Sequence, residues 1–588
     1  MFIIFKTRSL ARSRLRRGRC SVPCLHMSDK GNKLTPNFRH YFRHRAILQI
    51  NPYICIIVLP CRTLRTWIRG KDINPDTTTR LMRLLTALLL AAATIIPGSV
   101  TLRASENRHT GYYVATDGDD TSTGTLRRPF RTIARALAEA HAGDTVFVRG
   151  GTYREQVVFP ASGRADARIV LKAYGDERPV ISGEGITVEG RTDMLLIRGR
   201  SHITVEGLEI MALGTAEAGR EANGIVVEAG STDITLRGNH IHSIRNTAPR
   251  ETYPSAHAIL LIGNTEQAMR RITVEGNRIH DCVTGTSEAV TINGYVDGFR
   301  IESNEIFRCS NIAIDAAGGY AANRNPDLNY ARNGVICRNV IYDIDNELGQ
   351  LKGNCGAIAI YADGARDITI ERNRIHRCDR GIGIVSETDA YPTLRCTVRN
   401  NIVTSCRRTG IYMGGYLDYT GGGTERCAIH NNTLVGNNLL RGAFGETEGE
   451  LRLTENCRNN TIANNLVCTF TADDLFVHKY TATGGGNRFE RNLYSGPAGW
   501  LWQQRDGEPL RSLEAWREAS GGDDGAIYLA RPIFEFEPEL DSDFTPAGEA
   551  AADGITFGSS LRVLIDHATG KIFVRDSSAD KIEQTIAR

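Results

Sequence analysis

One short phrase recurs nine times between Asn239 and Tyr494: an apolar residue, two polar residues, an asparagine, any residue and a second apolar residue. A recurring unit with insertions of variable length is typical of a solenoid, because each coil can bury its apolar face only against its neighbours. Within each copy the apolar residues alternate with period two, which predicts short β-strands. The sequence therefore predicts an all-β fold, a parallel β-helix of roughly ten turns.

The repeated asparagine is expected to occupy one turn of every coil, because its side chain satisfies backbone groups and it tolerates left-handed dihedral angles. Stacked in register, these residues would form a hydrogen-bonded ladder of Asn239, Asn277, Asn304, Asn339, Asn373, Asn400 and Asn432, with looser copies at Asn464 and Asn492. Cys282, Cys309 and Cys378 each follow a ladder asparagine by five residues, which indicates a buried column of small apolar side chains. No C-x-x-C pair indicates zinc, and the sequence predicts no metal site.

The first eighty-one residues stand outside the repeat and carry seventeen Lys and Arg against three Asp. We interpret residues 1–81 as a mis-assigned upstream extension, with a disordered basic leader as the alternative. Residues 82–104 have the basic start, apolar run and small-residue end of a secretory signal peptide. The basic leader accounts for the formal charge of +4, so the remaining chain is acidic and the charge gives no reason to expect a nucleic-acid partner. We expect a secreted or periplasmic protein, with no membrane span after signal cleavage.

The two ends of the β-helix are expected to be capped, since an end coil exposes an unpaired edge. Residues 105–155 predict an N-terminal cap with an amphipathic helix over Phe130 to Ala140, and residues 156–495 predict the β-helix itself. Residues 496–588 predict a small C-terminal cap, with a helix over Ser512 to Ser520 and a hairpin over Leu561 to Val574.

The entry region carries a family resemblance. Tyr112-Tyr113-Val114 with Asp117-Gly118, then Arg-Pro-Phe-Arg-Thr-Ile and Gly-Asp-Thr-Val-x-Val-Arg-Gly-Gly-Thr-Tyr, resemble the start of right-handed parallel β-helix proteins of the pectate-lyase-like superfamily. The resemblance spans roughly residues 110 to 495 and implies a right-handed coil. Many members of that superfamily act on polysaccharides, yet the fold also hosts adhesins, so activity has to be argued from a site.

Two carboxylates align at the end of one predicted strand per coil. Counting from Ile360 and from Ile384, Asp363 and Glu387 fall at the same offset on adjacent coils, with Asp315 two residues earlier on the coil before. Parallel neighbours lie about 4.8 Å apart, so the pair should stand side by side where loops open. Such carboxylates repel one another, which raises one pKa and suits a glycosidase. The alternative is a pair of exposed turn acids.

The pair is also similar to that of β-helix β-xylosidases, and this resemblance implies Asp363 as nucleophile and Glu387 as acid/base. The long loops 316–332 and 414–424 flank the predicted pair. They supply aromatic and basic side chains suited to a sugar ring, and the candidate substrate-binding residues are Tyr320, Tyr330, Tyr416, Arg332 and Tyr361.

The sequence is therefore compatible with three functions. The first is a glycoside hydrolase acting, as a monomer without a cofactor, on a polysaccharide or oligosaccharide. The second is a polysaccharide lyase, in which Arg332, Arg366 or Arg380 would be the base and Ca²⁺ a cofactor. The third is a non-catalytic carbohydrate-binding or surface solenoid, whose acids serve only solubility.

Overall fold

The computed structural model describes residues 111–442, 445–534, 539–540, 542 and 558–559, and the backbone of 4–6, 46–51, 54–58, 561–566 and 571–576. The chain divides into two units, Met1–Glu106 and Asn107–Arg588. In the first unit, β1 (Ile4–Lys6), β2 (Ala46–Asn51) and β3 (Ile54–Val58) pair antiparallel. The expected signal peptide, 82–104, lies outside the described residues, so export stays a prediction.

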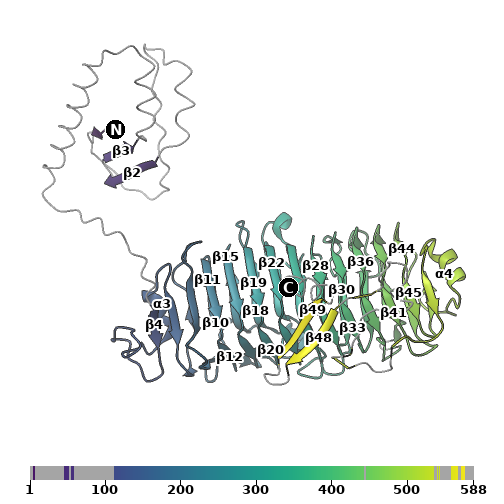
Figure 1. The fold of residues 1–588 in the computed structure, drawn as a ribbon, viewed down its shortest axis with the longest axis horizontal. Helices are drawn as coiled ribbons and strands as arrows, with labels where there is room; N and C mark the ends of the chain where they lie inside the picture. Colours follow the sequence, from purple (N-terminus) through teal and green to yellow (C-terminus); the bar gives the residue numbers. More distant parts are fainter. Residues whose placement is uncertain are drawn as a thin grey trace, which may run out of the picture. The chain divides into compact units, whose positions relative to one another are not determined.

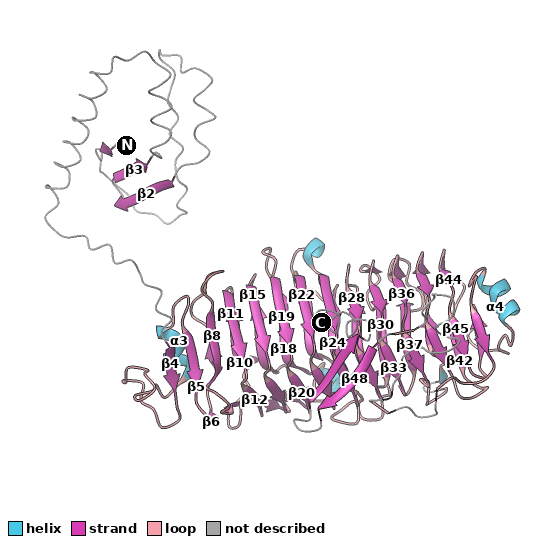
Figure 2. Ribbon diagram, viewed as in Figure 1, coloured by secondary structure: helices cyan, strands magenta, loops and turns pink. Residues whose placement is uncertain are grey.

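Three parallel sheets build the second unit, and successive coils add one strand to each (Figures 1 and 2). The first sheet holds β7 (Val157–Val158), β10 (Arg191–Arg198), β14 (Glu221–Glu228), β18 (Ser255–Gly263), β21 (Glu288–Gly294), β24 (Ile312–Ala317), β27 (Ile358–Asp363), β30 (Arg380–Ser386), β34 (Thr409–Gly415), β38 (Leu451–Leu453), β42 (Leu475–Lys479) and β46 (Gly499–Trp502). The second holds β4 (Gly111–Val114), β5 (Thr145–Val148), β8 (Ile169–Ala173), β11 (Ser201–Glu206), β15 (Thr232–Arg237), β19 (Arg270–Glu275), β22 (Asp297–Glu302), β25 (Arg332–Cys337), β28 (Thr369–Glu371), β32 (Thr397–Arg399), β36 (Ala428–His430), β40 (Thr461–Ala463) and β44 (Arg488–Glu490). The third holds β6 (Gly151–Tyr153), β9 (Pro179–Ser182), β12 (Glu209–Met211), β16 (His240–His242), β20 (Arg278–His280), β23 (Glu305–Phe307), β26 (Val340–Tyr342), β29 (Arg374–His376), β33 (Ile402–Thr404), β37 (Thr433–Val435), β41 (Leu466–Cys468), β45 (Leu493–Ser495) and β47 (Ile527–Leu529).

The remaining elements are short. Two small parallel sheets join β13 (Gly214–Thr215) with β17 (Arg245–Asn246), and β31 (Thr393–Leu394), β35 (Thr424–Glu425), β39 (Cys457–Arg458) and β43 (Gly484–Gly485). In the described residues the helical segments are α3 (Ile133–Glu139), η3 (Arg250–Thr252), η4 (Pro326–Leu328) and α4 (Leu513–Ser520). Among the described residues, none of the helices has the length and apolar composition of a membrane crossing.

The observed β-helix is longer than expected. Its larger sheets have thirteen strands, against the roughly ten turns predicted, and they run from β4 at residue 111 to β47 at residue 529. Part of the expected N-terminal cap, 105–155, is therefore already coil. The predicted helix is present as α3, which buries Ile133, Ala136 and Leu137.

Aliphatic side chains stacked in register fill the interior. Ile314, Ile360, Ile382 and Ile411 pair in succession along the first sheet, and all four are fully buried. The predicted cysteine column is confirmed, since Cys282, Cys309 and Cys378 belong to the same core. All ten cysteines in the described residues are unpaired thiols.

The asparagine ladder is confirmed, with a change of membership. Each ladder side chain donates to the amide oxygen of the next, as from Asn304 to Asn339 at 3.0 Å. The ladder runs through Asn239, Asn277, Asn304, Asn339, Asn373, Asn401, Asn432, Asn465 and Asn492 and ends on Asp523. Asn401 and Asn465 therefore replace the predicted Asn400 and Asn464. The residue before each ladder position has a positive φ, and Asn400 and Asn464 occupy that position at +55°.

The C-terminal residues depart from the expected cap. The predicted helix is present as α4, with Ser512 as its N-cap and Trp516 stacked on Trp500 at 6.0 Å. The predicted hairpin is present as β48 (Leu561–Asp566) and β49 (Lys571–Asp576). However, described residues between these elements contact the third sheet, where Arg374 donates to the carbonyl of Leu540 and the N–H of Ser559 donates to the hydroxyl of Thr433. Figure 1 accordingly shows the hairpin beside the middle coils, where β49 contacts β26.

Candidate active site

Strands β24, β27 and β30 of the first sheet place the predicted acids. Asp315 pairs with Tyr361 across β24 and β27, and Asp363 pairs with Val385 across β27 and β30. Glu387 therefore lies two residues beyond the partner of Asp363, and the equal offset predicted for the two acids is wrong. A shift of two residues leaves the side chain on the same face of the strand, because side chains alternate with period two. Both acids consequently still face outward from the coil.

The hydroxyl group of Tyr320 lies between the two carboxyl groups. It donates a short hydrogen bond to Oδ2 of Asp363, and it lies 3.0 Å from Oε2 of Glu387. The main-chain N–H of Glu387 donates to Oδ1 of Asp363 at 2.7 Å. Two hydrogen-bond lengths limit the separation of the nearest carboxyl oxygens to roughly 5–6 Å.

Three tyrosine hydroxyls converge on the carboxyl group of Glu387, and a fourth binds its main chain. Besides Tyr320, Tyr361 lies 3.0 Å and Tyr416 3.2 Å from Oε1, while Tyr419 binds the main-chain oxygen at 2.6 Å. Burial and the neighbouring acids raise the pKa values of Tyr320, Tyr361 and Tyr416, so all three phenols remain donors. The donor hydroxyls of Tyr361 and Tyr416 on Oε1 suit a carboxylate, which only accepts.

The second acid of the pair is in a different environment. Asp363 is fully buried, whereas Glu387 is partly exposed. Burial and the charge of Glu387 raise the pKa of Asp363 to about 8. The protonated form of Asp363 is therefore favoured up to a higher pH than in an ordinary aspartate.

Two further acids lie on the preceding coils, Asp315 buried and Glu288 partly buried. Asp315 is 4% exposed, and its Oδ1 has no hydrogen-bond partner within the described part of the chain. Burial and the nearby acids Glu288 and Asp363 raise its pKa. Glu288 accepts a hydrogen bond from Thr291 at 2.8 Å, and burial raises its pKa to about 7. Glu288, Asp315, Asp363 and Glu387 thus lie close enough for the charge of one acid to raise the pKa of another.

A pocket opens beside Glu387. It has a volume of about 310 Å³ and is lined by Tyr361, Arg380, Val385, Tyr412, Gly415, Tyr416, Leu417, Glu446, Arg452, Thr454, Glu455 and Tyr480. Tyr361 and Tyr416 belong both to this wall and to the hydrogen bonds on Glu387. Arg380 and Arg452 are ion-paired with Glu448 behind the pocket. The pocket therefore combines aromatic rings with fixed, charge-compensated guanidinium groups.

Two family models match the chain, described as "Pel9A-like, right handed beta helix region" over residues 112–262 and "Right handed beta helix region" over residues 356–497. The uncharacterized protein YwoF of Bacillus subtilis is 33% identical over 446 residues, which cover 74% of this chain and 91% of YwoF. This chain belongs to the YwoF family of right-handed parallel β-helix proteins.

Two further likenesses are more limited. Pectate lyase PEL9 of Emericella nidulans is 42% identical over 74 residues, which cover 12% of this chain and 18% of that protein. The crystal structure of the GH136 lacto-N-biosidase from Eubacterium ramulus superposes with a TM-score of 0.44 at 14% identity, covering 64% of this chain and 67% of that one. Neither likeness extends beyond the fold.

The two other predicted binding residues of this YwoF-family chain do not contact the acids. Arg332 donates to the hydroxyl of Tyr330 at 3.1 Å. The guanidinium groups of Arg332 and Arg366 lie 3.7 and 3.9 Å from the centre of the Tyr330 ring. The Tyr330 ring is thus covered by guanidinium groups, and the binding role of Tyr330 and Arg332 stays a prediction.

Sequence reasoning missed Glu288, Tyr412 and Arg452, whereas Arg380 was expected only as a possible base of a lyase. Glu288 is the first residue of β21, the strand that pairs with β24, which carries Asp315. An acid at the start of this strand was the available signal. Arg452 pairs with Tyr412 outside the repeated phrase, so the repeat does not mark its position.

Proposed function

We propose that this YwoF-family protein is a glycoside hydrolase acting on an oligosaccharide or polysaccharide, with Asp363 and Glu387 as its acid pair. The observation that carries the proposal is the Tyr320 hydroxyl, which lies within hydrogen-bond reach of both carboxyl groups beside a pocket. A sugar oxygen that displaced this hydroxyl would meet a proton donor and a carboxylate together. Glycosidases need these two groups on either side of the scissile bond.

The electrostatics favour one division of roles. Asp363, with its pKa raised to about 8, is suited to give a proton to the leaving oxygen. Glu387 is partly exposed and held by tyrosine donors, so it is suited to attack or stabilise the anomeric carbon. This division is the reverse of the one that the β-xylosidase resemblance implies.

The separation of the pair favours retention of configuration. Retaining enzymes have carboxyl groups about 5–5.5 Å apart, and inverting enzymes about 6.5–9.5 Å. The shared contact with Tyr320 limits the nearest oxygens to roughly 5–6 Å. Because Tyr320 covers Asp363, we infer that this exposed loop residue moves aside when a substrate binds.

The pocket is the proposed sugar subsite. Tyr416 is exposed, and Tyr361 and Tyr412 form the wall next to Glu387. Aromatic walls with a few fixed polar groups are typical of small-molecule sites of about 300 Å³ or more. We propose that a ring of the glycan binds here, next to the acid pair.

A polysaccharide lyase is the second candidate, because Arg380 lines the pocket next to Glu387. A lyase of the expected kind would also bind Ca²⁺ through acids. In the described part of the chain, the four acids do not bring three carboxylate oxygens within 4.8 Å of one another. For this reason the hydrolase is preferred.

The test is a screen of the full chain against a panel of glycans, with reducing-sugar release and ultraviolet absorbance read together. Reducing-sugar release without new absorbance supports the hydrolase. Release with the absorbance of a new double bond supports the lyase. Binding without any product would support a non-catalytic solenoid.

A further inference from the structure

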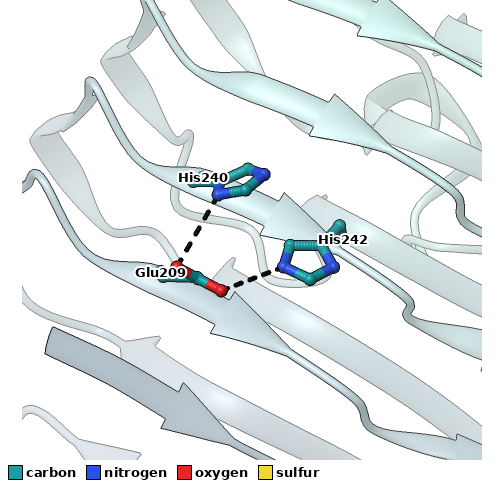
Figure 3. Close-up of side chains that lie close together, drawn as sticks. All are labelled: Glu209, His240 and His242. Atoms are coloured by element: carbon teal, nitrogen blue, oxygen red, sulfur yellow. Dashed lines mark hydrogen bonds and ion pairs between the residues drawn. The ribbon is translucent and has the colours of Figure 1, made fainter. Parts of the chain in front are cut away.

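A second polar cluster lies on the third sheet, away from the acid pair of the first sheet. Glu209 of β12 pairs in register with His240 of β16, and His242 follows two residues later (Figure 3). Oε1 of Glu209 lies 3.2 Å from Nε2 of His242, and Oε2 lies 3.8 Å from Nδ1 of His240. One ligand atom from each residue lies within 4.8 Å of the other two. All three side chains are partly exposed to solvent.

Hydrogen bonds behind the cluster fix which nitrogen of His240 carries its proton. Nδ1 of His280 lies 2.6 Å from the carboxylate of Asp281, so it is the protonated nitrogen and Nε2 of His280 is an acceptor. Nε2 of His240 lies 2.7 Å from that acceptor and must donate to it. In neutral His240, Nδ1 is then a bare lone pair facing the Glu209 carboxylate.

Two acceptors facing one another at 3.8 Å repel, unless a cation lies between them. The geometry points to a divalent transition-metal site formed by Glu209, His240 and His242, and we propose Zn²⁺ as its ion. Imidazole and carboxylate are the ligands that Zn²⁺ accepts, at about 2.0–2.2 Å. Ligands at that distance in a tetrahedral array lie roughly 3.4 Å apart. The separation from Oε1 of Glu209 to His242 is 3.2 Å, and that from Oε2 to His240 is 3.8 Å, so a small movement of the carboxylate brings the three residues around one ion.

The surroundings resemble the outer shell of a metal site. Ligating histidines usually donate their second N–H to another group, which orients the ring. His240 does so to His280, and Nδ1 of His242 lies 3.1 Å from the hydroxyl of Ser243. The ring of His242 stacks on His280 at 5.0 Å, and His280 stacks on Phe307 at 4.7 Å. These stacked rings therefore hold one ligand, His242, in place.

Binding has a defined proton balance. Without metal, Nε2 of His242 donates its proton to Glu209; with metal, that nitrogen needs its lone pair and Nδ1 becomes the protonated one. The proton that His242 loses from Nε2 is replaced on Nδ1, so the ring stays neutral, and no net proton is released at pH 8. The ion would link β12 to β16 and thereby stabilise two adjacent coils.

The experiment is a calorimetric Zn²⁺ titration of the full chain after treatment with a chelator. Glu209→Gln and His242→Phe each remove a ligand, and the phenyl ring keeps the stack with His280. We expect one Zn²⁺ site that is weakened at least about 100-fold in both variants, since loss of an outer partner alone costs about 10–100-fold. His280→Phe preserves the stack and removes the acceptor for His240, so it should weaken binding by about 10–100-fold.

His202→Asn and Glu206→Gln, one strand before the cluster, are the matched controls. Asparagine suits position 202, whose φ is +59°. Both controls should bind Zn²⁺ as the wild type does, and Co²⁺ should give a d–d absorption band that Glu209→Gln abolishes. Absence of saturable binding, or equal affinity in the wild type, Glu209→Gln and His242→Phe, would overturn the proposal.

Discussion

The main-chain N–H of Glu387 donates a 2.7 Å hydrogen bond to Oδ1 of Asp363, which belongs to the preceding coil. Because the hydroxyl of Tyr320 binds the other oxygen, both oxygens of Asp363 are held by groups from outside its own strand. The orientation of this buried acid thus depends on the next coil and on the 316–332 loop. Perturbing either one should change the acid pair without disturbing the apolar core.

The raised pKa of Asp363 predicts a stability that depends on pH. Its pKa is about 8 in the folded chain and near the ordinary 3.8 when unfolded. The contribution of Asp363 to the free energy of unfolding is fully present below pH about 4, and it is lost as the pH rises through about 8. Between pH 5 and pH 8, the unfolding free energy of the wild type should fall by more than that of Asp363→Asn, and the difference should be at least about 1–2 kcal/mol. Urea unfolding of both proteins at these pH values measures the difference, and identical losses would contradict the assignment.

Removal of the Tyr320 hydroxyl should move the pH profile of activity. The hydrogen bond from Tyr320 lowers the pKa of Asp363, so Tyr320→Phe raises that pKa further. If Asp363 donates the proton, activity falls above pH about 8 in the wild type, and at a higher pH in the variant. Rates measured between pH 5 and 10 test this, with Tyr330→Phe as a control that leaves the profile unchanged. A downward shift would exclude Asp363 as the acid.

The corrected ladder can be tested at one pair of neighbours. Asn401→Ala leaves the buried N–H of Asn373 and the carbonyl of Ile370 without the Asn401 side chain and should cost about 1–3 kcal/mol. Asn400→Gly keeps the positive φ and should cost no more than about 0.5 kcal/mol. Thermal unfolding of the two variants compares them directly. A larger loss at position 400 would return that residue to the ladder.

The repeat predicted the fold because it records what every coil has in common: an apolar interior and one turn. It could not fix the register between coils, since the inserted loops differ in length. Asp363 was therefore aligned with Glu387, although its partner is Val385. At Asn400-Asn401 the sequence offered two asparagines for one position, and only the turn geometry chooses between them. Glu288 and Arg452 lie outside the repeated phrase, so no repeated feature marks them.

The most direct test compares the full-length wild type with Glu387→Gln and the surface control Glu425→Gln on the glycan panel. We expect the wild type and the control to release reducing sugar without producing new ultraviolet absorbance. Release by Glu387→Gln should be lower by about 10³-fold or more, because a carboxylate at the reacting centre is lost. Equal release by wild type and Glu387→Gln would contradict the proposed acid pair, and no release from any glycan by the wild type would contradict the proposed hydrolase.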